Sequence, residues 1–150
     1  MRLDDYSAEF RPDIAAGIDA MPSTRWLGLR CIGFAPGRSA IEMPIRPELT
    51  FDGRNVQGAI VGVLADYAAI SSTSAAVGED MAALTAGFTL QNIAPARGER
   101  LVALGRVVSH TRSSAVGASD VYAVSGDDWT LVATCLASSR LVDRARFARH

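Results

Sequence analysis

The sequence predicts an α+β fold in which one antiparallel sheet wraps around one central helix. The first observation is a segment, residues 55–78, that contains a single charged residue, Asp66, and is too long for one strand. The second is that the segments after it alternate apolar and polar residues and are separated by turn-forming Gly, Pro and Asp. The 150 residues fit a single domain, which we place at 1–150.

The chain before this segment predicts a short helix and a hairpin. Residues 7–20 favour a helix with Ser7 as its N-cap, so that 1–22 is an N-terminal helical extension. Two apolar segments follow at 26–34 and 39–45, and the Pro and Gly between them fit a turn. We therefore expect these two segments to pair as antiparallel strands.

Residues 56–78 predict a helix, because Ala, Leu and Gln favour helical conformation. The apolar residues surround the helix axis instead of forming one stripe, which indicates a buried helix. A membrane span is disfavoured, because Asp66 near its centre would cost roughly 3 kcal/mol and Ser and Thr fill residues 71–74.

The rest of the chain predicts a four-stranded antiparallel meander. We expect its strands at 84–93, 100–109, 113–124 and 129–140, with turns at 96–99 and 126–128. An Arg-rich tail, residues 141–150, follows, and its arginines are expected to be solvated.

Composition narrows the class of partner. The formal net charge is −1 and all 15 basic residues are Arg, so no overall field favours nucleic acid or an anionic membrane. Cys31 and Cys135 are far apart and the chain has 2 His, which predicts free thiols and no metal site. No secretory signal opens the sequence, so a cytoplasmic location is expected.

Asp66 has three interpretations. It is a surface residue, a structural carboxylate held by nearby hydroxyl groups, or a functional group whose charge or pKa is used. The start of the helix supports the third, because the first N–H groups near Gly58 and Ala59 have no partner within a helix and attract a developing oxyanion. Asp66 follows Gly58 by eight residues, about 12 Å along a helix. The two groups meet on one carbonyl only if antiparallel helices of two subunits meet at a two-fold axis.

Gln57-Gly58-Ala59, followed by Leu64-Ala65-Asp66, resembles the His/Gln-Gly-Gly…Leu-x-Asp signature of hotdog-fold acyl-CoA thioesterases of the phenylacetic-acid-degradation (PaaI-like) group. The likeness extends over roughly residues 20–142. It implies a hotdog fold, in which a curved antiparallel sheet wraps the long central helix, and the hydrolysis of acyl-CoA thioesters. It also implies a homodimer formed edge to edge, which often doubles to a homotetramer as a dimer of dimers.

Carried over by position, the resemblance implies the catalytic roles. Gly58 would donate its N–H to the oxyanion, Asp66 would be the nucleophile or general base, and Thr85 would orient the attacking water. Gln57 stands where many members have His and would hydrogen-bond near the thioester without titrating. We expect hydrogen bonds from Thr85 and the partner's helix to lower the pKa of Asp66 more than burial raises it.

Two positions depart from the family's pattern. Ala59 replaces the second Gly, and Phe51 stands where some relatives have an Asn that holds the catalytic water. Asn55 is close enough in the sequence to substitute for that Asn. We place both Asn55 and Ala59 at the substrate, and we expect these departures to affect rate and specificity more than fold.

The chemistry of the substrate suggests further binding residues. The phosphates of CoA call for Arg, and Arg112 is the candidate, although a solvated turn explains it equally well. Tyr67, Phe88 and Trp26 either shape the acyl pocket or are core and interface aromatics. No cofactor is expected, because CoA is part of the substrate.

Other functions fit the sequence less well. It has no Gly-x-Ser-x-Gly motif, and pairing of His110 with either Cys would be accidental. A hotdog dehydratase would need a catalytic His where Gln57 stands. The serious alternative is a non-catalytic acyl-CoA binding or sensing protein of the same fold, which the missing second Gly favours.

Overall fold

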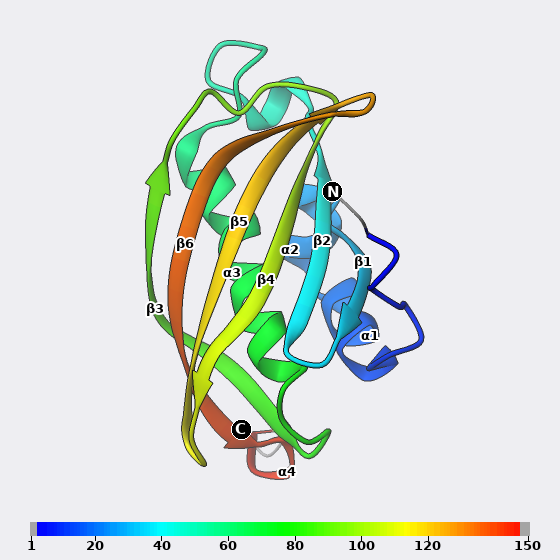
Figure 1. Ribbon diagram of the computed structural model, residues 1–150, viewed down its shortest axis with the longest axis vertical. Helices are drawn as coiled ribbons and strands as arrows, with labels where there is room; N and C mark the ends of the chain where they lie inside the picture. Colours follow the sequence, from blue (N-terminus) through cyan, green and yellow to red (C-terminus); the bar gives the residue numbers. More distant parts are fainter. Residues whose placement is uncertain (1–2, 148–150) are drawn as a thin grey trace.

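The computed structural model describes residues 3–147 as one curved sheet wrapped around a long helix, α3 (Gly58–Ser74) (Figure 1). Six antiparallel strands form the sheet in the order β1-β2-β4-β5-β6-β3. Their bounds are β1 Arg30–Ala35, β2 Arg38–Pro44, β3 Met81–Asn92, β4 Arg100–His110, β5 Ser114–Ser125 and β6 Asp128–Asp143. The prediction of an α+β fold with a sheet around one central helix is therefore confirmed.

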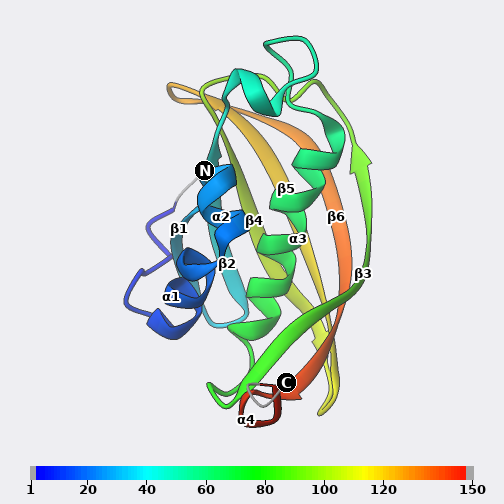
Figure 2. The same ribbon diagram turned by 180° about the vertical axis from the view of Figure 1, so that it is seen from behind.

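Short helices flank this core. Figure 2 shows α1 (Pro12–Ala20) and α2 (Pro22–Leu27) beside α3 on the same side of the sheet. A short 3-10 helix, η1 (Pro47–Leu49), precedes α3, and α4 (Arg144–Phe147) follows β6. No helix among residues 3–147 is long and apolar enough to cross a membrane.

The predicted four-stranded meander is wrong in one connection. β3 does not pair with β4 but with β6, where Thr85 lies opposite Ser139, and β4 pairs instead with β2. Alternating hydrophobicity identifies a strand but not its neighbour, and the connection at 93–99 is long enough to cross the end of the sheet. β3 is therefore an edge strand, and it runs beside α3.

The N-terminal region also differs from the prediction. α1 begins after Arg11, which has no side-chain cap, while Ser7 is no N-cap and accepts a hydrogen bond from the Glu9 N–H at 3.1 Å. Trp26 belongs to α2 instead of a strand and is 66% exposed, so it is neither a core nor a pocket residue. Gly28 ends α2 at φ 72°, a conformation that glycine adopts without strain.

The central helix is buried because the sheet approaches its backbone very closely. A Cβ atom added at Gly105 or Gly117 would overlap the carbonyl oxygens of α3. Ser39 and Ser119 donate hydrogen bonds from the sheet to carbonyl oxygens of α3, at 2.6 and 2.8 Å. These contacts fix the rotation of α3, and this rotation decides which side chains face β3.

Candidate functional site

One face of α3 follows the edge strand β3 along its length. Residues 58, 62 and 66 are four apart and therefore share this face. A Cβ atom at Gly58 would lie 2.9 Å from the side-chain nitrogen of Asn92, and one at Gly62 would meet Phe88 at 3.5 Å. Asp66 lies next along the face and contacts Thr85. Gly58 and Asp66 of the predicted motif thus lie on one seam between α3 and β3.

Asp66 is held by a side chain of β3. The hydroxyl of Thr85 donates to the two carboxylate oxygens of Asp66, at distances of 3.1 and 3.0 Å. Burial raises the pKa of Asp66 above its ordinary value, and the hydrogen bond from Thr85 opposes this effect only in part. In the single chain, without the partner's helix that the expectation invoked, desolvation is the larger effect and the pKa is raised.

A neighbouring thiol is kept neutral in the same region. Burial first, and then the negative charge of Asp66, raise the pKa of Cys135 to about 11. A thiol with this pKa is protonated near neutral pH and is a poor nucleophile. Cys135 is buried on the inner side of β6, so Asp66 is the more suitable reactive group here.

The beginning of α3 exposes backbone donors. Gln57 is the N-cap residue and its side chain makes no capping hydrogen bond. The N–H of Ile60 donates to the Gln57 carbonyl at 2.9 Å, whereas no acceptor for the N–H groups of Gly58 and Ala59 is found in the described part of the chain. Gln57 and Ala59 are exposed. This geometry suits an anion or an oxyanion.

A small pocket of about 310 Å³ opens beside Gly58. Asn55 lines it and donates its side-chain NH₂ to Asp52 at 2.6 Å, while its side-chain oxygen is buried without a partner among the described residues. Asn92 lines it from the end of β3, and sequence reasoning missed this residue. A polar Asn that ends an apolar strand was the available signal.

A single chain does not bring the two reactive groups together. Gly58 and Asp66 are two helical turns apart on the same face, a separation of about 12 Å. The far edge of β3 pairs with no strand within the described residues, although 84–89 are exposed along it. Leu84 and Phe88 are 36% and 47% exposed. An apolar open edge of this length is a template for pairing with another chain.

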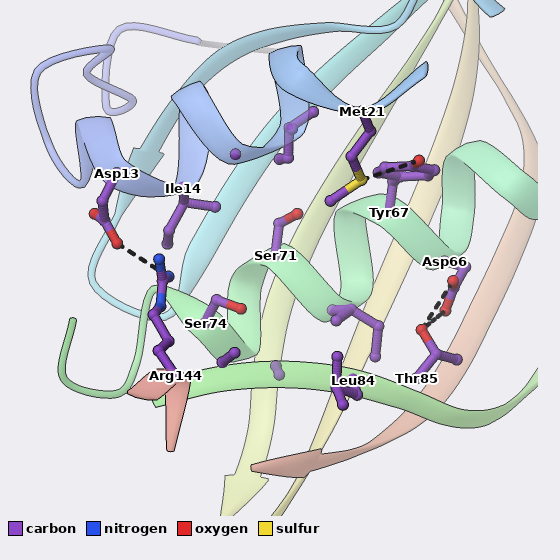
Figure 3. A pocket seen from close by; sticks show the side chains of 15 residues that line it. Asp13, Ile14, Met21, Asp66, Tyr67, Ser71, Ser74, Leu84, Thr85 and Arg144 are labelled. Carbon is purple, nitrogen blue, oxygen red and sulfur yellow. Dashed lines mark hydrogen bonds and ion pairs between the residues drawn. The ribbon is translucent and has the colours of Figure 1, made fainter. Parts of the chain in front are cut away.

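A larger cavity of about 600 Å³ lies between α1, α3 and β3. Figure 3 shows Asp66 and Thr85 at one end of it and Asp13 and Arg144 at the other. The wall between these ends is mainly apolar and includes Ile14, Gly17, Ile18, Met21, Tyr67, Ile70, Ala82, Ala83 and Leu84. The sequence did not indicate that α1 forms one wall, although Ile14 and Ile18 are spaced four apart, as on one helix face.

The far end of this cavity is closed by an ion cluster. Arg11 is 9% exposed and binds Asp13 through two nitrogens, at 2.9 and 3.0 Å, and the carbonyl oxygens of Ser74 and Val77 at 2.6 Å. Arg144 also binds Asp13, at 3.1 Å, so this arginine is not solvated as predicted for the tail. The hydrogen bonds from Arg11 lower the pKa of Asp13. The cluster fastens α1 to the end of α3.

The remaining predicted residues occupy different places. Tyr67 lines the larger cavity, and its hydroxyl is 2.9 Å from the Ser23 hydroxyl on α2. Phe88 lies over Gly62 on the α3–β3 seam and does not line this cavity. Arg112 is in the β4–β5 turn, which Figure 1 shows at the opposite end of the sheet from Gly58. Phe51 is 70% exposed beside the smaller pocket, and Arg149 lies outside the described residues.

The described residues hold no group of three or more His, Cys, Asp or Glu side chains placed to bind a metal ion.

Comparison with solved structures identifies proteins of the same fold. A thioesterase family protein from Silicibacter pomeroyi is 26% identical, with 89% of this chain and 98% of that chain covered and a TM-score of 0.84. The PaaI protein of the E. coli phenylacetic acid degradation operon is 18% identical, with 85% and 88% covered and a TM-score of 0.74. A phenylacetic acid degradation-related protein from Ralstonia eutropha is 18% identical, with 85% and 98% covered and a TM-score of 0.71.

These neighbours confirm the predicted hotdog fold, and the Silicibacter pomeroyi neighbour also supports the resemblance to thioesterase-family proteins. No family model matches the sequence, and the search of curated proteins gives no significant match. The likeness is thus carried by the three-dimensional structure.

Proposed function

We propose that this protein hydrolyses acyl-CoA thioesters to a free acid and CoA, at a site completed by two copies of the chain. Asp66 of one subunit and the Gly58 N–H of the partner subunit act on the same thioester. The observation that carries this proposal is the shared face of α3, which presents Gly58 and Asp66 about 12 Å apart toward an open edge strand.

Pairing of β3 with β3 of a second copy would give the open strand edge a hydrogen-bonding partner. A two-fold axis between the copies would also place the two α3 helices antiparallel, with each Asp66 opposite the start of the other helix. The similar solved structures support hydrolysis of thioesters in general, because the Silicibacter pomeroyi neighbour is named a thioesterase family protein.

The chemistry follows from the groups in this arrangement. The thioester oxygen would accept the Gly58 N–H, a stabilisation worth about 3–4 kcal/mol where such a donor has been deleted. Asp66, with its proton affinity raised by burial, would take a proton from the water that attacks the carbonyl carbon. The tetrahedral intermediate then expels the CoA sulfur as the C–S bond breaks, and this sulfur takes up the proton.

We place the acyl group in the cavity of about 600 Å³, which begins at Asp66 and Thr85. Its walls are mainly apolar, so an aryl, arylacetyl or short to medium-chain acyl group fits better than a polar one. Tyr67 forms part of the wall, whereas Phe88 is placed at the dimer contact.

The direct test is a panel of acyl-CoA thioesters assayed by release of free thiol, with the wild type and Asp66→Asn in parallel. Loss of the carboxylate should lower kcat by about 10²-fold or more, because general base catalysis supplies 10²–10⁴-fold. Turnover undiminished in Asp66→Asn would contradict the proposal. Tight binding of acyl-CoA without turnover by the wild type would favour the non-catalytic binding protein instead.

A further inference from the structure

Three arginines surround a second cavity that the catalytic proposal does not use. This cavity has a volume of about 570 Å³ and is lined by Ile45, Arg46, Pro47, Gly53, Arg54, Arg97, Gly98 and Ser125. None of these lining residues is acidic. The whole chain has a formal net charge of −1, so three positive charges around one recess are a local feature and not a consequence of composition.

The three guanidinium groups are not neutralised by ion pairs. The ion pairs within residues 3–147 involve Arg11, Arg30, Arg100, Arg106 and Arg144, and none involves an arginine of this cavity. Arg46 donates to the Trp26 carbonyl oxygen at 2.6 Å, but its Nε is buried with no acceptor in the described part of the chain. A buried donor without an acceptor is unfavourable, so Arg46 has hydrogen-bonding capacity that the described residues leave unused.

Glu48, Asp52 and Glu99 each lie two positions from one of these arginines in the sequence, and none of the three lines the cavity. Asp52 accepts hydrogen bonds from the backbone N–H groups of Arg54 and Asn55, at 2.9 and 2.7 Å, and from the Asn55 side chain. Asp52 thus holds the loop in shape. Arg54 itself lines the recess.

The recess lies next to the proposed oxyanion donor. Its Arg54 and Arg97 directly adjoin Asn55 and Ala96, which line the pocket of Gly58. Figure 1 shows that the loop before α3, the β3–β4 connection and the β5–β6 turn gather at the end of the molecule where α3 begins. A ligand that extends from one cavity to the other would therefore span an anion site and the thioester site.

We propose that Arg46, Arg54 and Arg97 bind the phosphate groups of the nucleotide part of CoA. This inference rests on the proposed function and names the thiol carrier of its substrate as CoA. Guanidinium groups bind phosphate through paired, charge-assisted hydrogen bonds, so a cradle of three suits a nucleoside bisphosphate. An acidic carrier protein is the less suitable partner, because its surface carboxylates would have to enter the recess that these arginines line.

The test compares two thioesters of the same acyl group, one on CoA and one on N-acetylcysteamine, which carries no phosphate. Arg54→Ala/Arg97→Ala should raise KM for the acyl-CoA at least about tenfold, because charge-assisted hydrogen bonds are lost, and should leave kcat similar. Its kcat/KM for the N-acetylcysteamine thioester should not change. The KM of Arg54→Lys/Arg97→Lys for the acyl-CoA should lie between those of the wild type and the alanine variant, because Lys keeps the charge without the paired donors. Arg38→Ala removes an exposed arginine at the start of β2 that does not line this cavity, and it is the control.

A binding measurement separates this inference from the proposed function. Adenosine 3′,5′-bisphosphate, titrated by calorimetry, should bind the wild type and Arg38→Ala, and binding to Arg54→Ala/Arg97→Ala should be at least about tenfold weaker. If the wild type binds this probe but hydrolyses no thioester, the anion site is supported and the proposed hydrolase function is refuted. Unchanged KM and probe affinity in the double variant, or a defect confined to acyl-carrier-protein thioesters, would overturn the inference.

Discussion

The Thr85 hydroxyl donates to Asp66 across the seam between edge strand β3 and helix α3, at 3.0 and 3.1 Å from its two carboxylate oxygens. This contact joins β3 to Asp66, the one charged residue of the buried helix α3. The sequence alone did not predict the correct neighbouring strand for β3. It also opposes the effect of burial, which raises the pKa of Asp66. The balance between the two sets the pH below which Asp66 becomes protonated.

Removal of the Thr85 hydroxyl should move the pH dependence of hydrolysis. Asp66 acts in its ionised form, so kcat/KM falls as the pH decreases through its pKa. Thr85→Val removes the hydrogen bond that lowers this pKa, and the acidic limb should therefore shift to higher pH. Thr85→Ser keeps the donor and should retain the wild-type limb. A pH–kcat/KM profile identical in Thr85→Val and the wild type would refute this role.

Asp66→Asn should stabilise the fold near neutral pH while it abolishes activity. A carboxyl group with a raised pKa binds its proton more tightly in the folded state than in the unfolded state. The free energy of unfolding therefore falls as the pH rises from the pKa of the unfolded state to the pKa of the folded state. The amide carries no charge and escapes this loss. The melting temperature of Asp66→Asn should thus exceed that of the wild type at pH 7, and the difference should vanish in acid below both pKa values.

The control for that comparison is Asp128→Asn, which changes an exposed carboxylate at the start of β6. It should have little effect on the melting temperature at either pH. A lower melting temperature for Asp66→Asn at pH 7 would mean that the ionised form is favoured in the assembled protein, against the direction found for one chain.

Gly17→Leu should narrow the acyl specificity. Gly17 lines the larger cavity, and a Cβ atom there would have no neighbour within 4 Å, so a side chain would project into the space assigned to the acyl group. Leu should also stabilise helix α1 relative to Gly, by less than about 1 kcal/mol. We expect kcat/KM for bulky acyl-CoAs to fall about tenfold or more relative to acetyl-CoA, with the fold intact.

Ala16→Leu is the matched control, because Ala16 is exposed on the same helix and does not line the cavity. It should leave the ratio of bulky to small substrates unchanged. If Gly17→Leu and the wild type had the same ratio of kcat/KM for bulky and small acyl-CoAs, the acyl group would bind outside this cavity.

Local patterns predicted the parts of the fold and site that lie close together in the sequence. The helix α3 and the spacing of Gly58 and Asp66 follow from composition and helical geometry, whereas Thr85 was indicated by the family resemblance. The partner of β3 did not, because alternation specifies which face of a strand is buried and not which strand lies beside it. The structure pairs β3 with β6, with Thr85 opposite Ser139.

Groups assembled from distant segments were missed for a related reason. Arg11 meets the end of α3 more than sixty positions later in the chain, and Arg46, Arg54 and Arg97 come from three connections. No local periodicity links such residues. Arg11 also adopts φ 59°, an unusual conformation for a residue with a side chain, at the position directly before α1.

The central claim is that each active site takes Asp66 from one subunit and the Gly58 N–H from the other. Gly58→Pro removes this N–H where proline is tolerated, since position 58 begins the helix and Gln57 has the extended ψ of 135° that precedes proline well. Gly58→Ala brings a similar Cβ contact with Asn92 but keeps the N–H, and is the steric control.

The most direct measurement mixes two inactive homodimers, Asp66→Asn and Gly58→Pro, after dissociation, and assays thiol release. A mixed dimer has one site with both groups intact, so equal mixing should restore about a quarter of the wild-type activity. Neither homodimer alone should reach this level. Absence of any recovery, with mixed dimers present and Gly58→Ala active, would show that the two groups do not act across the interface.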